Sequence, residues 1–235
     1  MDFSTEAAFR AQTEQMLDKV AALGATVVLA QVRPFADALY PSAYFPFSHL
    51  CTGQQGQDPG FDPLEIWVTA AHARGLELEA WVNPYRIQQG QTPALCAQSP
   101  AVQHPDWVKT TDTGSYLDPA NPAVRQYIAD ALGELCRNYA VDGVHFDDYF
   151  YQNAAKGKTY KDWDDKISAS KYGKEAGYDI SNKSYDDYGV NGLYAWRRNN
   201  INNLVSKLYE EIKKRKPYVK WTISPAGAWR NKNKL

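Results

Sequence analysis

Four segments rich in β-branched and apolar residues alternate with helix-period segments, and this alternation constrains the fold more than any other feature of the chain. The predicted strands are Thr26–Val32, Leu76–Val82, the start of Val141–Tyr151, and Lys220–Pro225. Connections before the strands are short, and long loops follow the first three. Such alternation predicts a parallel sheet covered by helices, with any site at the carboxyl ends of the strands.

The length of 235 residues suits a single domain, because α/β barrels commonly run that long without splitting. A (β/α)8 TIM barrel has eight strands, whereas this chain supplies four, starts with a helix and ends just after a strand. We therefore expect a partial TIM barrel over residues 1–235, lacking the first strand and the last three βα units. A smaller, complete open α/β sheet is the alternative. Residues 152–190, rich in Lys, Asp, Tyr and Gly, are expected to form a long exposed insertion.

Capping residues mark the starts of the predicted helices. Ser4 or Thr5 can cap the first helix, and Asp62-Pro63 starts the second in the order of cap followed by proline. Asn121-Pro122 starts a third helix that runs to Asn138. A fourth helix is expected from about Gly192 to Arg215.

Composition argues against several classes of function. A formal net charge of −1 gives no electrostatic case for binding nucleic acid, and no apolar run approaches the length of a membrane span. The sequence has no glycine-rich phosphate loop and no GxSxG motif, so we expect no nucleotide cofactor. We also expect no bound metal, because three of the histidines do not cluster with acids at the spacing of metal ligands: His49, His72 and His104.

Side-chain alternation predicts a polar face shared by the four strands. Val144 and Phe146 lie on one side of the third strand, and His145 and Asp147 lie on the other. If the apolar side meets the helices in each strand, the polar residues all line the barrel interior: Gln31, Arg33, Glu79, Asn83, His145, Asp147, Thr222 and Ser224. Buried polar groups usually have a partner or a function, so this convergence predicts a site.

Two adjacent carboxylates end the third strand, and they are the predicted catalytic groups. Paired acids suit glycoside hydrolysis, in which one protonates the leaving oxygen and the other attacks or activates water. Asp147 points inward by alternation, and Asp148 sits where the strand turns into the loop. Each could instead be a loop-capping aspartate.

Other residues at the strand tips are predicted to bind substrate. Arg33 and Arg86 could hold a carboxylate, although an ion pair with Asp37 or Asp147 is the structural alternative. His145 is expected to be a hydrogen-bonded interior residue rather than a base. Asn83 and Ser224 supply polar tips, and several aromatic rings could stack on sugars or fill the core: Tyr40, Tyr85, Tyr149, Tyr151 and Trp229.

An ordered run of motifs resembles the bacterial glycosyl-hydrolase-like family 10, formerly a domain of unknown function. The motifs are Gln31–Phe35, Asp37–Ser42, Gly60–Leu64, Ala80–Arg86, Leu117–Pro119, Val141–Tyr151, Ile223–Pro225 and Trp229–Asn231. The resemblance covers nearly the whole chain and implies a TIM-barrel enzyme that acts on carbohydrate. It places the acids at Asp147 and Asp148, and polar tips at Arg33, Asn83 and Ser224.

The resemblance also frames the functional expectations. It implies a glycoside hydrolase acting on an oligo- or polysaccharide such as bacterial cell-wall glycan, in an extracellular or cell-envelope protein. Family members have a strand before Asp2-Phe3 and further strands after Asn231, so a second catalytic carboxylate could lie beyond Leu235. Self-association through exposed strand edges is then expected. A non-catalytic carbohydrate-binding module and an inactive barrel fragment are the alternatives.

Overall fold

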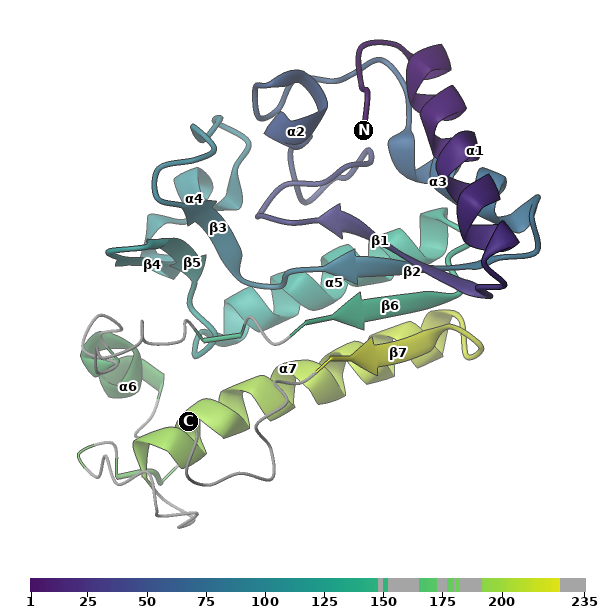
Figure 1. Ribbon diagram of the computed structural model, residues 1–235. Coiled ribbons are helices and arrows are strands. Elements are labelled where there is room, and N and C mark those ends of the chain that lie inside the picture. Colours follow the sequence, from purple (N-terminus) through teal and green to yellow (C-terminus); the bar gives the residue numbers. More distant parts are fainter. Residues whose placement is uncertain (148–149, 152–164, 173–176, 180, 182–191, 225–235) are drawn as a thin grey trace.

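The chain forms a four-stranded parallel sheet in this computed structural model, which describes residues 1–147, 150–151, 165–172, 177–179, 181 and 192–224. The strands β1 (Val27–Arg33), β2 (Glu77–Val82), β6 (Gly143–Phe146) and β7 (Lys220–Ile223) lie side by side in that order. Their arrows point the same way, so their carboxyl ends meet at one edge (Figure 1). The expected parallel α/β sheet is confirmed.

Four long helices accompany the strands, as predicted. They are α1 (Glu6–Ala22), α3 (Pro63–His72), α5 (Pro122–Asn138) and α7 (Leu193–Arg215). Thr5, rather than Ser4, caps α1 by accepting a hydrogen bond from the Ala8 amide. Asp62 caps α3 and Asn121 caps α5, so both predicted cap-then-proline starts are confirmed.

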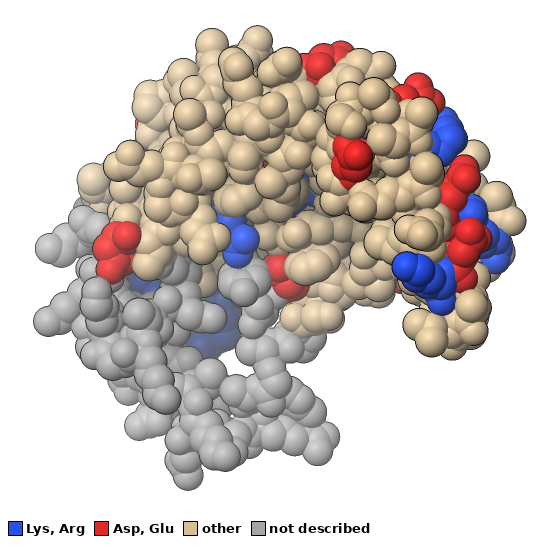
Figure 2. All heavy atoms as spheres, turned by 45° about the horizontal axis from the view of Figure 1, so that its top comes forward, with Lys and Arg blue, Asp and Glu red and all other residues tan. Residues whose placement is uncertain are grey.

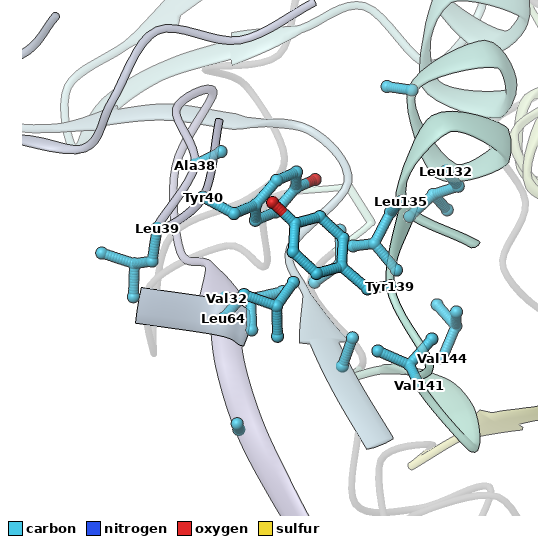
Figure 3. Packing of buried hydrophobic residues seen from close by; sticks show 14 of the residues in the cluster. Val32, Ala38, Leu39, Tyr40, Leu64, Leu132, Leu135, Tyr139, Val141 and Val144 are labelled. Carbon is cyan, nitrogen blue, oxygen red and sulfur yellow. The ribbon is translucent and has the colours of Figure 1, made fainter. Parts of the chain in front are cut away.

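The hydrophobic core lies between the apolar face of the sheet and these helices. Leu78, Ala80 and Val82 of β2 are buried there, as are Val144 and Phe146 of β6. Figure 3 shows the region around Tyr40 and Tyr139, whose rings meet edge to face with centroids 5.5 Å apart. Because the apolar face is covered, the opposite face is left to form the barrel interior.

A second, antiparallel sheet stands beyond the carboxyl end of β2. It contains β3 (Arg86–Gln89), β4 (Val108–Thr111) and β5 (Gly114–Leu117) in the order β3-β5-β4, and it lies on the side to which the main strands point (Figure 1). Sequence reasoning treated this region as one long loop, and that reading is wrong. Its strands are four residues long and mostly polar, so they carry little of the alternation that predicts a strand.

Short helices lie in the long loops that follow β1, β2 and β6. They are α2 (His49–Thr52), α4 (Pro100–Gln103), the 3-10 turn η1 (Pro105–Trp107) and α6 (Lys166–Tyr172). The α6 helix falls inside residues 152–190, which were expected to form a long exposed insertion. Ser168 and Ala169 are instead buried. Asp165 forms a buried ion pair with Arg197 of α7, so this part of the insertion is packed against the domain.

An apolar cavity of about 490 Å³ lies beside β1, lined by residues that include Phe3, Met16, Leu29, Leu50 and Trp67. Its lining includes Gln31 but neither His145 nor Asp147, so it is separate from the polar tips of β6 and β7. No helix among the described residues is both long and apolar enough to cross a lipid bilayer.

Candidate active site

The inner face of β2, β6 and β7 gathers the polar side chains that alternation predicts. Trp81 of β2 is level with His145 of β6, and His145 is level with Thr222 of β7. Level neighbours in a parallel sheet project from the same face, so the three side chains form one layer. The convergence predicted for Glu79, His145, Asp147, Thr222 and Ser224 is therefore confirmed by register and, as described below, by hydrogen bonds.

Asp147 stands just past the end of β6 and is only 8% exposed. The indole Nε1 of Trp81 lies 3.2 Å from its Oδ2 and donates a hydrogen bond to it. Sequence reasoning did not single out Trp81, although Trp81 shares the alternation of Glu79 and Asn83. A large aromatic residue on the polar side of a strand, next to the tip, was the signal that could have identified it.

A chain of hydrogen bonds runs below this carboxylate across three strands. Thr222 Oγ1 lies 2.8 Å from Glu79 Oε2 and 2.8 Å from His145 Nδ1. On the other side of the ring, His145 Nε2 lies 3.1 Å from Ser224 Oγ. His145 is therefore bonded at both ring nitrogens, as expected for an interior residue, and Ser224 is exposed at the tip of the sheet.

Gly143 makes room for this chain. Glu79 must reach past β6 to meet Thr222 on β7, and it is level with Gly143 as it does so. A Cβ atom at position 143 would lie 2.6 Å from Glu79 Cγ and 2.8 Å from its carboxyl carbon. Real side chains do not approach so closely, so the absent side chain at 143 is what permits the link between Glu79 and Thr222.

The Glu79 carboxylate belongs to the hydrogen-bond chain beneath Asp147. The backbone of Glu79 is level with Gly143, four residues before Asp147, and its Oε2 is bonded to Thr222, which is level with His145. Glu79 therefore supports the residues beneath the site.

Arg33 is not on the inner face, and the expectation for it is wrong. The register of β1 against β2 shifts near its end, where Gln31 is level with Trp81 but Arg33 is level with Val82. Val32 is thus an extra residue of β1 relative to β2, as in a β-bulge, and the side chain of Arg33 turns to the core side of the sheet. Its guanidinium stacks on Phe45 at 4.3 Å and is 1% exposed.

The surroundings of Arg33 are those of a buried structural cation. Its Nη2 donates to the carbonyl oxygens of Asn83 and Pro84, each at 3.3 Å. Burial lowers the pKa of Arg33 to about 10, and nearby Tyr40, Tyr127 and Asp37 act against that shift. In this position the guanidinium cannot reach a sugar in the barrel.

Three other predicted contacts around the tip of β2 are structural in this arrangement. Asn83 is buried and donates through Nδ2 to the Pro34 carbonyl at 3.1 Å. Tyr85 and Tyr40 are buried in the core, and burial raises the pKa of both hydroxyls. The stacking surfaces expected from these two tyrosines are therefore corrected to core positions.

Among the remaining predicted residues, the structure describes Arg86 and Tyr151 but not the other three. Arg86 lies in β3 with its guanidinium 6.0 Å from the Phe35 ring centre, and Tyr151 accepts a hydrogen bond from Asn200 at 3.1 Å. Burial raises the pKa of the Tyr151 hydroxyl. Asp148, Tyr149 and Trp229 lie outside the described residues, so their roles stay predictions. Within those residues, no group of three or more His, Cys, Asp or Glu side chains is placed to hold a metal ion.

Comparison with known proteins agrees with the resemblance seen in the sequence. The profile of the family described as glycosyl hydrolase-like 10 matches residues 2–235. Glycosyl hydrolase YngK of Bacillus subtilis (strain 168) is 42% identical over 219 residues, covering 92% of this chain and 40% of that protein. Glycosyl hydrolase DigH of Escherichia coli (strain K12) is 38% identical over 241 residues, covering 95% and 50%.

Solved structures share the fold at low sequence identity. One is alpha-L-fucosidase isoenzyme 2 from Paenibacillus thiaminolyticus, with a TM-score of 0.58, 15% identity, and coverage of 90% of this chain and 28% of that one. Another is the PgaB (BpsB) glycoside hydrolase domain from Bordetella bronchiseptica, with a TM-score of 0.58, 15% identity, and coverage of 91% and 58%. These likenesses support the TIM-barrel class for the parallel sheet.

The chain spans about 40 to 50% of the length of the curated relatives it matches. The family match nevertheless covers nearly every residue and includes each strand tip described above. The chain belongs to the glycosyl hydrolase-like 10 family.

Proposed function

We propose that the protein hydrolyses glycosidic bonds in a polysaccharide, with Asp147 as a catalytic carboxylate at the carboxyl ends of the barrel strands. The observation that carries the proposal is the position of Asp147: a nearly buried acid at a strand tip, oriented by Trp81 and placed above a polar network. TIM barrels place their active sites at this end of the strands. Family membership supports the reaction class.

The hydrogen bond from Trp81 suggests the catalytic role of Asp147. An N–H donor fixes the orientation of a carboxylate oxygen and stabilises its negative charge. An ionised carboxylate can attack the sugar or activate water, whereas the general acid must start protonated. Asp147 is thus the nucleophile or base in this proposal. The proton donor is a second carboxylate, and Asp148 is the nearest candidate in sequence.

The substrate we propose is bacterial cell-wall glycan, which would place the parent protein in the cell envelope or outside the cell. The support is the bacterial origin of the glycosyl hydrolases that this chain resembles.

The test is Asp147→Asn, with the release of reducing ends from cell-wall glycan strands and from other polysaccharides as the measurement. Loss of a catalytic carboxylate should lower kcat by roughly a hundredfold to ten-thousandfold without lowering the melting temperature. Asp142→Asn is the matched control, because it changes the same residue type at the opposite end of β6. Its hydrolysis rate should stay at the wild-type level.

Two results would overturn the proposal. Full activity in Asp147→Asn would show that the carboxylate is not catalytic. Binding of glycan by the wild-type protein, without release of reducing ends from any polysaccharide offered, would instead identify a carbohydrate-binding module.

A further inference from the structure

For an ionised Glu79 and a neutral His145, the hydrogen-bond chain beneath Asp147 has a single consistent order of donors and acceptors, which starts at Glu79. An ionised carboxylate only accepts, so the 2.8 Å contact between Glu79 Oε2 and Thr222 Oγ1 uses the one hydroxyl hydrogen of Thr222. The other acceptor near that hydroxyl is the Val144 carbonyl, at 3.5 Å. The shorter contact to a charged acceptor is the stronger one, so Thr222 donates to Glu79.

The hydrogen bond from Thr222 to Glu79 decides which nitrogen of His145 carries the proton. Because the hydroxyl hydrogen of Thr222 is donated to Glu79, Thr222 Oγ1 can only accept a hydrogen bond from His145 Nδ1, 2.8 Å away. The neutral ring therefore has its proton on Nδ1, and Nε2 is left as an acceptor. Ser224 Oγ, 3.1 Å from Nε2, must then donate its own hydrogen to the ring.

The ring is also held in place around these bonds. The Trp81 indole meets it edge to face, with ring centres 6.4 Å apart. The backbone N–H of Ser224 donates to the Phe146 carbonyl at 2.9 Å, which fixes the serine at the tip of β7 next to β6. Three acidic groups share the inner face with His145 in the described part of the sheet: Glu79 and Glu77 on β2 and Asp147 at the end of its own strand. Glu77, at the start of β2, pairs with Lys220.

We propose that Glu79 and Thr222 are positioning residues that hold His145 in the Nδ1–H tautomer, and that Ser224 thereby becomes a specificity-determining hydrogen-bond acceptor. The exposed Ser224 oxygen has no hydrogen left to offer, since its hydrogen is bonded to His145. It can accept from a sugar hydroxyl or amide N–H, and it disfavours a carboxylate or phosphate at the same point. This reading of the ligand rests on the proposed function, whereas the proton order does not.

The test is to observe the tautomer directly by NMR. The protein is labelled with 15N in its histidine rings and measured at about pH 8, above the ordinary titration range of histidine. Two-bond correlations between ring protons and nitrogens distinguish the protonated nitrogen from the bare one in each of the four histidines. His145→Gln identifies the signals of residue 145 by their disappearance.

The expected result is an Nδ1–H ring at His145 in the wild-type protein. Thr222→Val keeps the side-chain shape but removes the hydroxyl that Nδ1 needs, so the ring should change to the Nε2–H tautomer and donate to Ser224. Glu79→Met frees the Thr222 hydroxyl to donate to Nδ1 and should give the same change. Thr222→Ser keeps the hydroxyl, and Ser224→Ala removes only the partner of Nε2, so both should keep the Nδ1–H form.

An Nε2–H ring in the wild-type protein would overturn the proposal, as would an unchanged tautomer in Thr222→Val. The signals of the other three histidines report whether each variant is folded. Because the measurement needs no substrate, an Nδ1–H ring in a protein without hydrolase activity would refute the proposed function and leave the proton order intact.

Discussion

The amino-terminal end of the parallel sheet keeps its charges paired in contact with water, whereas the carboxyl-terminal end holds its charges among buried groups. At the first end, Arg74 pairs with Asp18 at 2.6 Å, and Lys220 pairs with Glu77. Figure 2 shows charged side chains gathered along its right-hand edge, where the strands begin. At the other end, Asp147 and its neighbour His145 are each 8% exposed.

This difference separates two uses of polar side chains. Exposed ion pairs are screened and contribute little to the free energy of folding. A buried carboxylate persists only with hydrogen-bond partners that are themselves fixed, so its geometry is defined by its neighbours. Substitutions at the carboxyl-terminal end should therefore alter the site, and those at the amino-terminal end should have little effect on it.

After Asp147→Asn, the largest effect is expected from Trp81→Phe. This substitution keeps an aromatic ring but removes the N–H that orients Asp147. A hydrogen bond to a charged group is worth about 1.5 to 3 kcal/mol, so kcat for glycan hydrolysis should fall about ten- to a hundredfold. Trp221→Phe on the opposite face is the matched control, because the Trp221 indole nitrogen has no hydrogen-bond partner among the described residues. Equal rates in the two variants would remove Trp81 from the site.

A smaller effect, on stability, is expected from Gly143→Ala. The added methyl group would contact Glu79 Cγ at 2.6 Å, and overpacking of this kind costs about 1 to 3 kcal/mol of unfolding free energy. Denaturant unfolding measures it. The double variant with Glu79→Ala should recover most of the loss, because the residue that clashes is gone. Additive losses in the two single variants would show that position 143 and Glu79 are not in contact.

The smallest effect is expected from Lys220→Gln at the amino-terminal end. The pair with Glu77 is exposed, so the melting temperature should shift by less than about 3 °C, and raising the salt to about 1 M should abolish the difference. The glycan hydrolysis rate should stay unchanged. A loss of activity here would mean that the two ends of the sheet are coupled.

The order of the main elements could be predicted from the sequence because local signals agreed with the tertiary structure. Asp62-Pro63 and Asn121-Pro122 cap helices whose apolar sides pack on the sheet. The antiparallel sheet from Arg86 to Leu117 was missed because its strands are short and mostly polar, and because one of its pairings joins distant segments. Tyr116 of β5 pairs with Arg86 of β3, thirty residues earlier in the chain.

The residues of the candidate site, too, could be predicted from the sequence only in part. Alternation placed His145, Asp147, Thr222 and Ser224 on one face, since nothing interrupts the period of two in β6 and β7. It failed for Arg33, because one extra residue in β1 changes the side to which the next side chain points. Tyr40 and Tyr85 illustrate another limit: an aromatic residue near a strand tip packs inward or faces a ligand according to neighbours that the local sequence does not reveal.

The extra residue in β1 also changes the electrostatic field at the mouth of the barrel. With Arg33 turned into the core, β1 brings no guanidinium to the inner face at its tip. A cation at that point would attract anionic groups. We therefore expect β1 to contribute no electrostatic attraction for the carboxylate or phosphate groups of uronic-acid or phosphorylated polymers.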